Sequence, residues 1–332
     1  MASLREVFKK DLILPFIPAD PVRETPFWTS GAFSSDGRVN QLISAGSQTF
    51  TVPMINDLDA KVEPNYSNTI YTDIAVPRGI DAKSMQGRMA YLNEGFLESR
   101  LEKYLQGGVS ALPLIAQQIS GYWQQEAEQR AIATIIGIRN NDQATGKKIT
   151  IESATAFDAS LFLDAEATMA RKYRGRGAIV VHPSVALALR KAQLLIPFTD
   201  PANLRTVDTF NGRTVIESLD GTKVGTTVAN TQYVSYMLNA DAFAAESVAG
   251  YDDLELERSA SRASGGGTNT LWTRRNMLIH PMGYSFVAAE SSLTGGTANE
   301  AISASWEDLQ KAANWSLITE ASKVPFRIIV SK

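Results

Sequence analysis

The two histidines are the side chains of this sequence best suited to moving a proton near neutral pH. His182 and His280 each end an apolar run and precede a proline, in the frames IVVHP and MLIHP. A hydrolase would also need a nucleophile, and the sequence has no G-x-S-x-G elbow. We interpret the two frames as similar strand ends. A cytosolic α/β hydrolase would be favoured only if one histidine met an acid and a nucleophile in a cleft.

The sequence gives equally little support for a metal site or a nucleotide-binding loop. Asp57, Asp59 and Glu63 share a turn-rich stretch, but oxygen ligands without a convergent second segment rarely hold a cation, so we interpret them as a solvated loop tip. The chain has no cysteine, which removes thiolate ligands, Cys nucleophiles and disulfides. Gly175-Arg176-Gly177 precedes a strand instead of following one, so it is no dinucleotide loop. We expect no catalytic residue, no cofactor and no metal, and a chain that is not an enzyme.

Opposite charges gather in two separate segments. The basic segment holds Arg171, Lys172, Arg174 and Arg176, and the acidic one holds Asp252, Asp253, Glu255 and Glu257. The basic cluster could meet phosphate, an acidic patch on another copy of the chain, or only solvent. Patches of opposite sign on one chain are what a head-to-tail assembly uses to set its register. A formal net charge of −3 argues against affinity for nucleic acid through a strongly basic surface, but not against a container for DNA.

The bulk composition is that of a folded protein. At 332 residues, with 44% hydrophobic and 20% charged residues, the chain suits two or three compact units with a real core. The apolar patch at residues 12–17 is too short for a signal-peptide core, and no run approaches the roughly 20 apolar residues of a membrane helix. We expect a soluble protein without membrane contact.

Residues 1–40 are expected to form an irregular arm. Prolines 15, 18, 21 and 26 remove backbone donors and favour extended geometry. The stretch nevertheless carries Phe27, Trp28 and Phe33, which need a surface to pack on. Either the arm docks on its own body or it reaches a neighbouring subunit.

Residues 46–76 predict a long two-stranded excursion. Thr49–Pro53 and Ile70–Val76 resemble strands, and a polar, turn-rich stretch separates them. A two-stranded ribbon is marginal alone in water and needs a partner surface.

A long helix is the clearest element. From Val109 onward, apolar or small residues recur at spacings of three and four through Ile138, which is the helical period. Pro113 falls in the first turn, where proline is tolerated. We expect about 25 to 30 residues of helix, or roughly 40 Å at 1.5 Å per residue, ending at the turn Asn140-Asn141-Asp142.

Shorter strands and helices follow from residue 146. We expect a helix at Pro183–Gln193, and the Gly-rich Ser264–Thr268 reads as a hairpin loop. The predicted strands are Ala178–Val181, Thr214–Glu217, Tyr233–Leu238, Leu254–Leu256, Asn276–Ile279, Tyr284–Ala288 and Phe326–Val330. Their irregular spacing fits a mixed α/β chain and neither a barrel nor a repeat array.

The order of these parts resembles the Hong Kong 97-type major capsid protein of tailed bacteriophages. Motifs that resemble one family of such coat proteins occur in order along nearly the whole chain. They are Phe50-Thr51-Val52-Pro53 before Asn56-Asp57-Leu58, Tyr122-Trp123, Ile179 to Pro183, Glu257-Arg258, Arg274-Arg275 through His280-Pro281-Met282-Gly283-Tyr284, and Ala313-Asn314-Trp315. Each motif is weak alone, and their order carries the resemblance.

This resemblance implies a mixed α+β capsid fold in four parts. They are an N-terminal arm (1–40), an extended loop (41–80), a peripheral spine-helix domain (81–145 and 270–332) and an α/β axial domain (146–269). It also implies a structural subunit of an icosahedral virion capsid that forms pentamers and hexamers around double-stranded DNA, without reading its sequence, and that assembles in the host cytoplasm. An encapsulin-type bacterial compartment is the alternative with the same fold.

The resemblance also implies partners and contacts. Fewer than about 45 residues precede the loop, which suggests a separate scaffolding protein rather than a fused one; a portal and a decoration protein are further partners. Some coat proteins of this fold link a loop lysine to a neighbour's asparagine, for which Lys61 is the only lysine between residues 41 and 80; we expect no such link. The residues we expect at subunit contacts are Trp28, Lys61, Arg171, Arg174, Arg176, Asp253, Glu255, Arg274 and Arg275.

Overall fold

The computed structural model describes residues 25–34, 48–55, 63–79, 82–105, 112–199, 206–225, 231–240, 242–296 and 303–332. Its helices are α2 (Pro26–Thr29), α4 (Arg100–Leu105), α5 (Leu112–Thr145), α6 (Ala159–Ala167), α7 (Pro183–Lys191) and α8 (Trp306–Gln310). Its strands are β1 (Phe33–Ser34), β2 (Thr49–Ile55), β3 (Ala82–Arg88), β4 (Ala90–Ser99), β5 (Thr150–Glu152), β6 (Ala178–Val181), β7 (Ile196–Thr199), β8 (Thr206–Phe210), β9 (Arg213–Glu217), β10 (Lys223–Val224), β11 (Gln232–Leu238), β12 (Phe243–Ser259), β13 (Thr268–Pro281), β14 (Tyr284–Phe286), β15 (Trp315–Leu317) and β16 (Phe326–Ser331).

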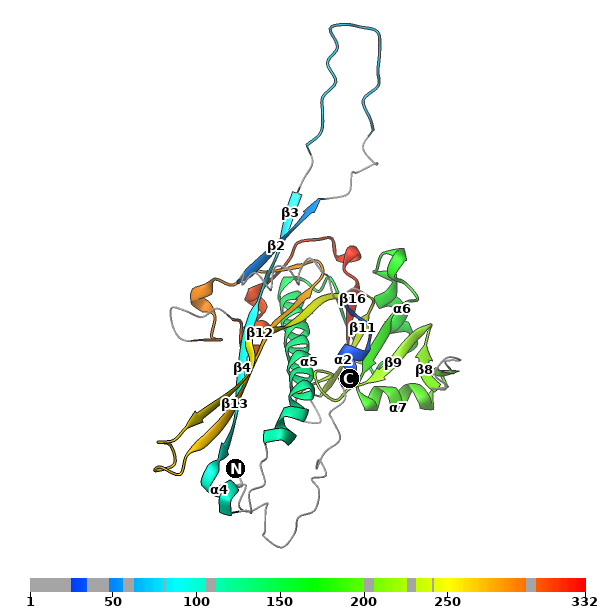
Figure 1. Ribbon diagram of the computed structural model, residues 1–332. Coiled ribbons are helices and arrows are strands. Elements are labelled where there is room, and N and C mark those ends of the chain that lie inside the picture. The colour runs from blue at the N-terminus through cyan, green and yellow to red at the C-terminus, as the bar shows by residue number, and fades with distance from the viewer. Residues whose placement is uncertain are drawn as a thin grey trace.

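Helix α5 runs through the middle of the body (Figure 1). It has 34 residues, a length of about 50 Å at 1.5 Å per residue, and Pro113 lies in its first turn as predicted. The turn predicted at Asn140-Asn141-Asp142 is wrong, because the helix continues to Thr145. Asn141 donates to the carbonyl oxygens of Ala312 and Trp315 at 2.9 and 2.7 Å, so these polar side chains bind neighbouring segments instead of ending the helix.

The first half of α5 packs on a four-stranded sheet of order β1-β12-β13-β4. Trp123 is buried between them, and its Nε1 donates to Oγ1 of Thr273 at 3.0 Å. Ile119, Leu271 and Met277 complete this small core. The apolar stripe predicted for the helix is therefore confirmed at this end.

Two predicted strands of this sheet are parts of longer ones. Leu254–Leu256 lies within β12 and Asn276–Ile279 within β13, and the two strands pair antiparallel with a register shift between Ala249 and Leu254. The outer part of this hairpin extends beyond the body, so its polar residues hide the strand pattern in the sequence (Figure 1). Ser259 pairs with Thr268, and the Gly-rich segment closes the hairpin as predicted.

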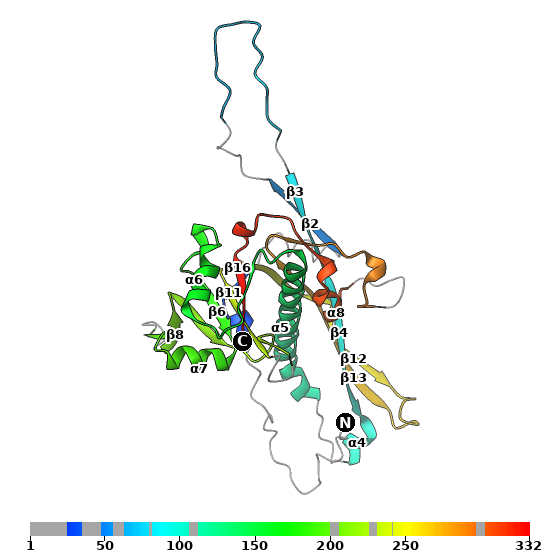
Figure 2. The ribbon, with the colours of Figure 1, turned by 180° about the vertical axis from the view of Figure 1, so that it is seen from behind.

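The other half of α5 packs on an eight-stranded mixed sheet, of order β5-β16-β11-β6-β9-β8-β7 with β10 beside β11. Successive side chains of a strand point to opposite faces. Ile328 and Val330 join Ile135 of α5 in one core, and Ile329 joins Phe162 of α6 and Val185 of α7 in another. Helix α5 thus covers one face, and α6 and α7 cover the other (Figure 2).

Most predictions for this region are confirmed. The strands predicted at Ala178–Val181, Thr214–Glu217, Tyr233–Leu238 and Phe326–Val330 and the helix at Pro183 correspond to β6, β9, β11, β16 and α7. Within the described ranges, no helix is long and apolar enough to cross a membrane. The predicted domain boundary between residues 269 and 270 falls inside β13.

The predicted excursion exists, but one of its strands is wrong. β2 pairs antiparallel with β3, from Thr49 opposite Arg88 to Ile55 opposite Ala82, and Ile70–Val76 has no strand structure. The sequence of β3, AKSMQGR, has no strand pattern of its own and takes its extended form from pairing with β2. Ile70–Val76 belongs to a loop that extends far from the body (Figure 1).

Candidate assembly surfaces

The described loop of residues 63–79 offers apolar side chains to solvent. Every side chain in this range is exposed, including Tyr71 at 102% and Ile74 at 89%. The loop is shaped by contacts between its own residues. Nδ2 of Asn65 donates to the carbonyl oxygen of Val76 at 3.0 Å, and Nδ2 of Asn68 donates to Oδ2 of Asp73 at 2.7 Å. The loop therefore holds a shape without contributing to the core.

The base of the loop is anchored firmly by the β2–β3 ribbon. The backbone N–H of Gln86 donates to Oγ of Ser285 at 3.1 Å. Arg88 pairs with Glu290 at 2.8 Å. Phe50 packs edge-on against His280 with ring centres 5.3 Å apart. A Cβ at Gly87 would overlap the ring of Phe50, so the ribbon packs closely at this point. An exposed loop on a rigid base is suited to contact with another molecule.

His280 has a structural role at this base. Its side chain is buried, and Nε2 lies 2.9 Å from the carbonyl oxygen of Tyr284. Burial lowers the pKa of His280 to about 4, although the hydrogen bond to Tyr284 opposes this. His182 instead caps α7, where its Nδ1 accepts from the N–H of Ser184 at 3.1 Å. Within the described residues no group of three or more acidic, His or Cys side chains could hold a metal ion.

Residues 25–34 of the arm dock on the body of their own chain. Phe27 is fully buried, with its ring centre 5.4 Å from that of Tyr236. Trp28 is 38% exposed and stacks on Phe33. Of the two arrangements open from the sequence, packing on the same chain therefore holds for this segment.

Glu128 of α5 anchors this arm segment. Its Oε1 accepts from the N–H of Phe27 at 2.8 Å, and its Oε2 accepts from the N–H of Trp28 at 3.0 Å. Burial raises the pKa of Glu128 to about 7, since it outweighs the two N–H donors, and Asp220 raises it further. The contact spans 101 residues in sequence, so no local pattern could have predicted it.

The basic cluster divides into two roles. Arg174 is used within the chain, because it donates to the carbonyl oxygens of Met169 and Ala167 at the end of α6. Arg171 and Arg176 are exposed. Buried Glu166 fixes the turn between them, accepting from the N–H of Gly175 at 2.6 Å and pairing with Arg213 at 3.2 Å. Exposed Arg171 and Arg176 thus flank a turn whose backbone is fixed by Glu166.

Three residues of the acidic segment have partners along the β12–β13 hairpin. Glu255 pairs with Arg274 at 2.7 Å, and Asp253 lies 3.7 Å from Arg275. Glu257 accepts from Nε1 of Trp272 at 2.8 Å. The four predicted contact residues of this hairpin therefore form two ion pairs within one chain. Their contact with a neighbour stays a prediction. Lys61 lies outside the described residues.

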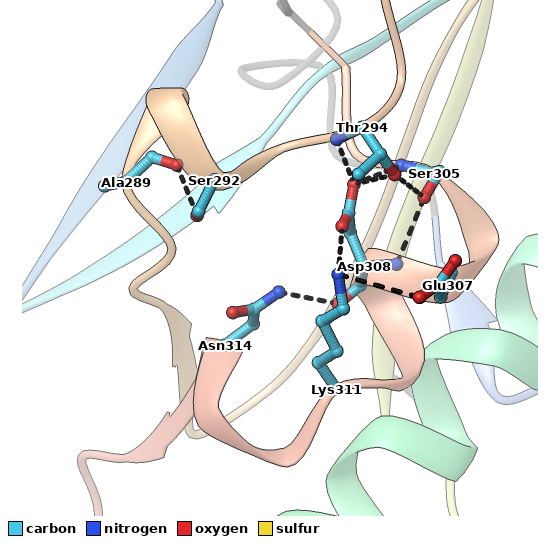
Figure 3. A network of polar contacts seen from close by, with 8 residues as sticks. All are labelled: Ala289, Ser292, Thr294, Ser305, Glu307, Asp308, Lys311 and Asn314. Atoms are coloured by element: carbon cyan, nitrogen blue, oxygen red, sulfur yellow. Dashed lines mark hydrogen bonds and ion pairs between the residues drawn. The ribbon is translucent and has the colours of Figure 1, made fainter.

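A buried carboxylate that sequence reasoning missed ties together the segment before α8 (Figure 3). Asp308 accepts from the N–H of Thr294 at 2.7 Å, the N–H of Ser305 at 3.1 Å and Nζ of Lys311 at 3.0 Å. Burial raises the pKa of Asp308, but these hydrogen bonds outweigh it and lower the pKa to about 2. Ser305 and Asp308 also form a capping box, so their spacing was a usable sequence signal.

Comparisons with solved structures identify this fold, whereas comparisons of sequence do not. No protein-family model matches the sequence, and no curated protein is detectably similar to it. The structure is similar to the Cyanophage Pam1 capsid asymmetric unit at 10% identity, with a TM-score of 0.57 over 100% of this chain and 97% of that one.

Two further solved structures agree. The head structure of Helicobacter pylori bacteriophage KHP40 gives 10% identity and a TM-score of 0.55 over 96% of this chain and 93% of that one. The holo-SrpI encapsulin complex from Synechococcus elongatus PCC 7942 gives 8% identity and a TM-score of 0.50 over 98% and 94%. At such identities the likeness is one of fold, and it confirms the expected one: the chain has the Hong Kong 97-type capsid fold.

Proposed function

We propose that this chain is the major capsid protein of a tailed double-stranded DNA bacteriophage, a structural subunit without enzymatic activity. The observation that carries the proposal is the loop of residues 63–79, which exposes large apolar side chains while its base is fixed to the body. Burying such a side chain is worth about 1.5 to 3 kcal/mol. An isolated subunit leaves that free energy unused, and a neighbouring copy can supply the missing surface.

The subunits form pentamers and hexamers that close into an icosahedral shell. In this arrangement residues 1–40 are the arm, 41–80 the extended loop, 81–145 with 270–332 the peripheral domain, and 146–269 the axial domain. Exposed Arg171 and Arg176 are available to a neighbour, as is the partly exposed ring of Trp28. Lys61, Arg174 and the hairpin residues Asp253, Glu255, Arg274 and Arg275 complete the proposed contacts.

Assembly takes place in the host cytoplasm with a separate scaffolding protein and a portal, and a decoration protein is a further proposed partner. The finished shell is the virion capsid. It encloses DNA without recognising its sequence, and a formal net charge of −3 argues against holding that DNA through a strongly basic surface.

Shortening the loop tests the proposal. Residues 63–79 are replaced by Gly-Gly, which leaves β2 and β3 intact, and the variant is expressed with the scaffolding protein. Because the removed side chains are all exposed, we expect a soluble subunit with an unchanged circular dichroism spectrum and melting temperature. Negative-stain microscopy should show closed shells for the wild type and none for the variant.

A matched control keeps the loop length. Tyr71→Ser with Ile74→Ser removes apolar surface alone, and we expect shell yield to fall while the subunit stays folded. Normal shells from the shortened variant, or its unfolding, would contradict the proposed role of the loop.

An encapsulin-type compartment is the second candidate, favoured by the similarity to the SrpI encapsulin fold. Such a shell would enclose protein cargo. The nucleic-acid content of shells purified from the cells that naturally produce them separates the two: packaged double-stranded DNA supports the phage capsid, and shells that hold only protein support the compartment.

A further inference from the structure

Residues 25–34 connect three parts of the fold through one short segment. Phe27 inserts beside Tyr236 of β11, and the N–H groups of α2 bind Glu128 of α5. β1 pairs in parallel with β12, where Phe33 lies opposite Phe243 and stacks on it with ring centres 5.1 Å apart. Whether this segment is docked therefore decides whether the two sheets and α5 are held together at this point.

The carboxylate that holds the segment lacks the usual compensation for a buried charge. Glu128 is 4% exposed, and no ion pair of the described residues includes it. An ionised carboxylate without a cationic partner is costly to bury. The two N–H donors offset part of that cost by favouring the charged form.

One neighbouring charge adds to the cost of burying ionised Glu128, and two other titratable groups do not offset it. Asp220, from the turn after β9, raises its pKa, and Tyr236 of β11 has a pKa raised to about 12 and stays neutral. On α5, Arg130 donates to the carbonyl oxygen of Ala304 at 2.9 Å instead. The docked residues 25–34 include no titratable side chain.

We propose that Glu128 is a protonation-controlled latch for residues 25–34: the protonated carboxyl keeps the segment docked on α5, and ionisation releases it. A protonated carboxyl still accepts one N–H through its carbonyl oxygen and avoids the buried charge. Release exposes Phe27, Trp28 and Phe33, an aromatic set suited to an apolar surface on a second copy.

The direction of the pH effect follows from linkage. The pKa of Glu128 is raised when the segment is docked, from 4.5 to about 7, so the docked state binds the proton more tightly than the released state. Docking is fully supported below pH 4.5 and weakens as the pH rises through about 7. The ceiling on this change is roughly 300-fold in the docking equilibrium, since each pKa unit is a factor of ten.

Hydrogen exchange on the unassembled subunit tests the latch, independently of whether shells form. Exchange of a peptide covering residues 25–34 is followed at pH 5.5 and pH 8.5 and corrected for the intrinsic pH dependence of exchange, with α7 as internal reference. We expect protection of the arm peptide to fall at least tenfold at the higher pH and that of α7 to stay constant.

Two variants make the result specific. Glu128→Gln keeps an acceptor but cannot ionise, so protection of the arm peptide should no longer depend on pH. Asp220→Asn leaves the latch in place and should move the midpoint to lower pH, which decides the matter even if Glu128→Gln folds poorly. Protection that is constant or rises with pH in the wild type, or a midpoint that Asp220→Asn leaves in place, overturns the proposal.

Discussion

At the scale of single residues, Trp123 links the helix to the sheet and its removal should be costly. Trp123→Ala removes a buried ring and leaves Oγ1 of Thr273 without its donor. We expect a loss of about 3 to 5 kcal/mol in the free energy of unfolding, measured by urea denaturation of the unassembled subunit. Trp306→Ala is the matched control, since Trp306 is 45% exposed and should cost less than about 1 kcal/mol. Equal losses for both would contradict this packing.

His280 should make the base of the loop sensitive to acid. Its folded-state pKa is lowered to about 4 from 6.5, so the unfolded chain takes up a proton before the folded chain does. The contribution of neutral His280 to the free energy of unfolding is therefore full above pH 6.5 and is lost as the pH falls toward 4. The ribbon of β2 and β3 should therefore lose exchange protection between pH 7 and pH 5, once the intrinsic pH dependence of exchange has been corrected for.

The variant His280→Gln isolates this effect. Glutamine can still donate to the carbonyl oxygen of Tyr284 but does not titrate in this range. We expect the ribbon of β2 and β3 to lose less exchange protection between pH 7 and pH 5 than in the wild type, whereas His182→Gln should retain most of the wild-type loss. An unchanged pH response in His280→Gln would show that other groups control it.

At the scale of elements, the contact between α5 and α8 depends on a glycine. A Cβ at Gly137 would overlap the carbonyl oxygen of Leu309 and crowd Nε1 of Trp315. Gly to Ala in a helix interior usually gains about 0.5 to 1 kcal/mol. Here we expect the opposite sign, a loss of about 1 to 3 kcal/mol, because the added methyl forces two packed elements apart. A raised melting temperature for Gly137→Ala would contradict the close approach.

Elements defined by local pattern could be predicted from the sequence, and those defined by pairing could not. The apolar period of α5 and the apolar run of β6 are local signals. Strand β3 has none, since only its pairing with β2 makes it extended, and Ile70–Val76 has a strand composition without a strand partner. The anchor of the arm is a hydrogen bond between Glu128 and Phe27, which are 101 residues apart in sequence. No local sequence pattern could therefore predict it.

At the scale of the whole molecule, we predict a shell without covalent links. Lys61 is the only lysine between residues 41 and 80. Cross-linking would also need a buried carboxylate beside the lysine and its partner, and the sequence offered no placement for one. Shells boiled in detergent should run as a single band near 36.1 kDa, with monomer subunit as the size reference. A ladder of multimers would contradict the prediction.

The place of β16 in the eight-stranded sheet has a consequence for the timing of synthesis. β16 lies between β5 and β11, and its residues Phe326–Ser331 are all buried. Until residues 326–331 have left the ribosome, β5 and β11 lack their shared neighbour and the two cores of this sheet lack Ile328, Ile329 and Val330. A growing chain therefore cannot complete either core of this sheet until residues 326–331 have joined it.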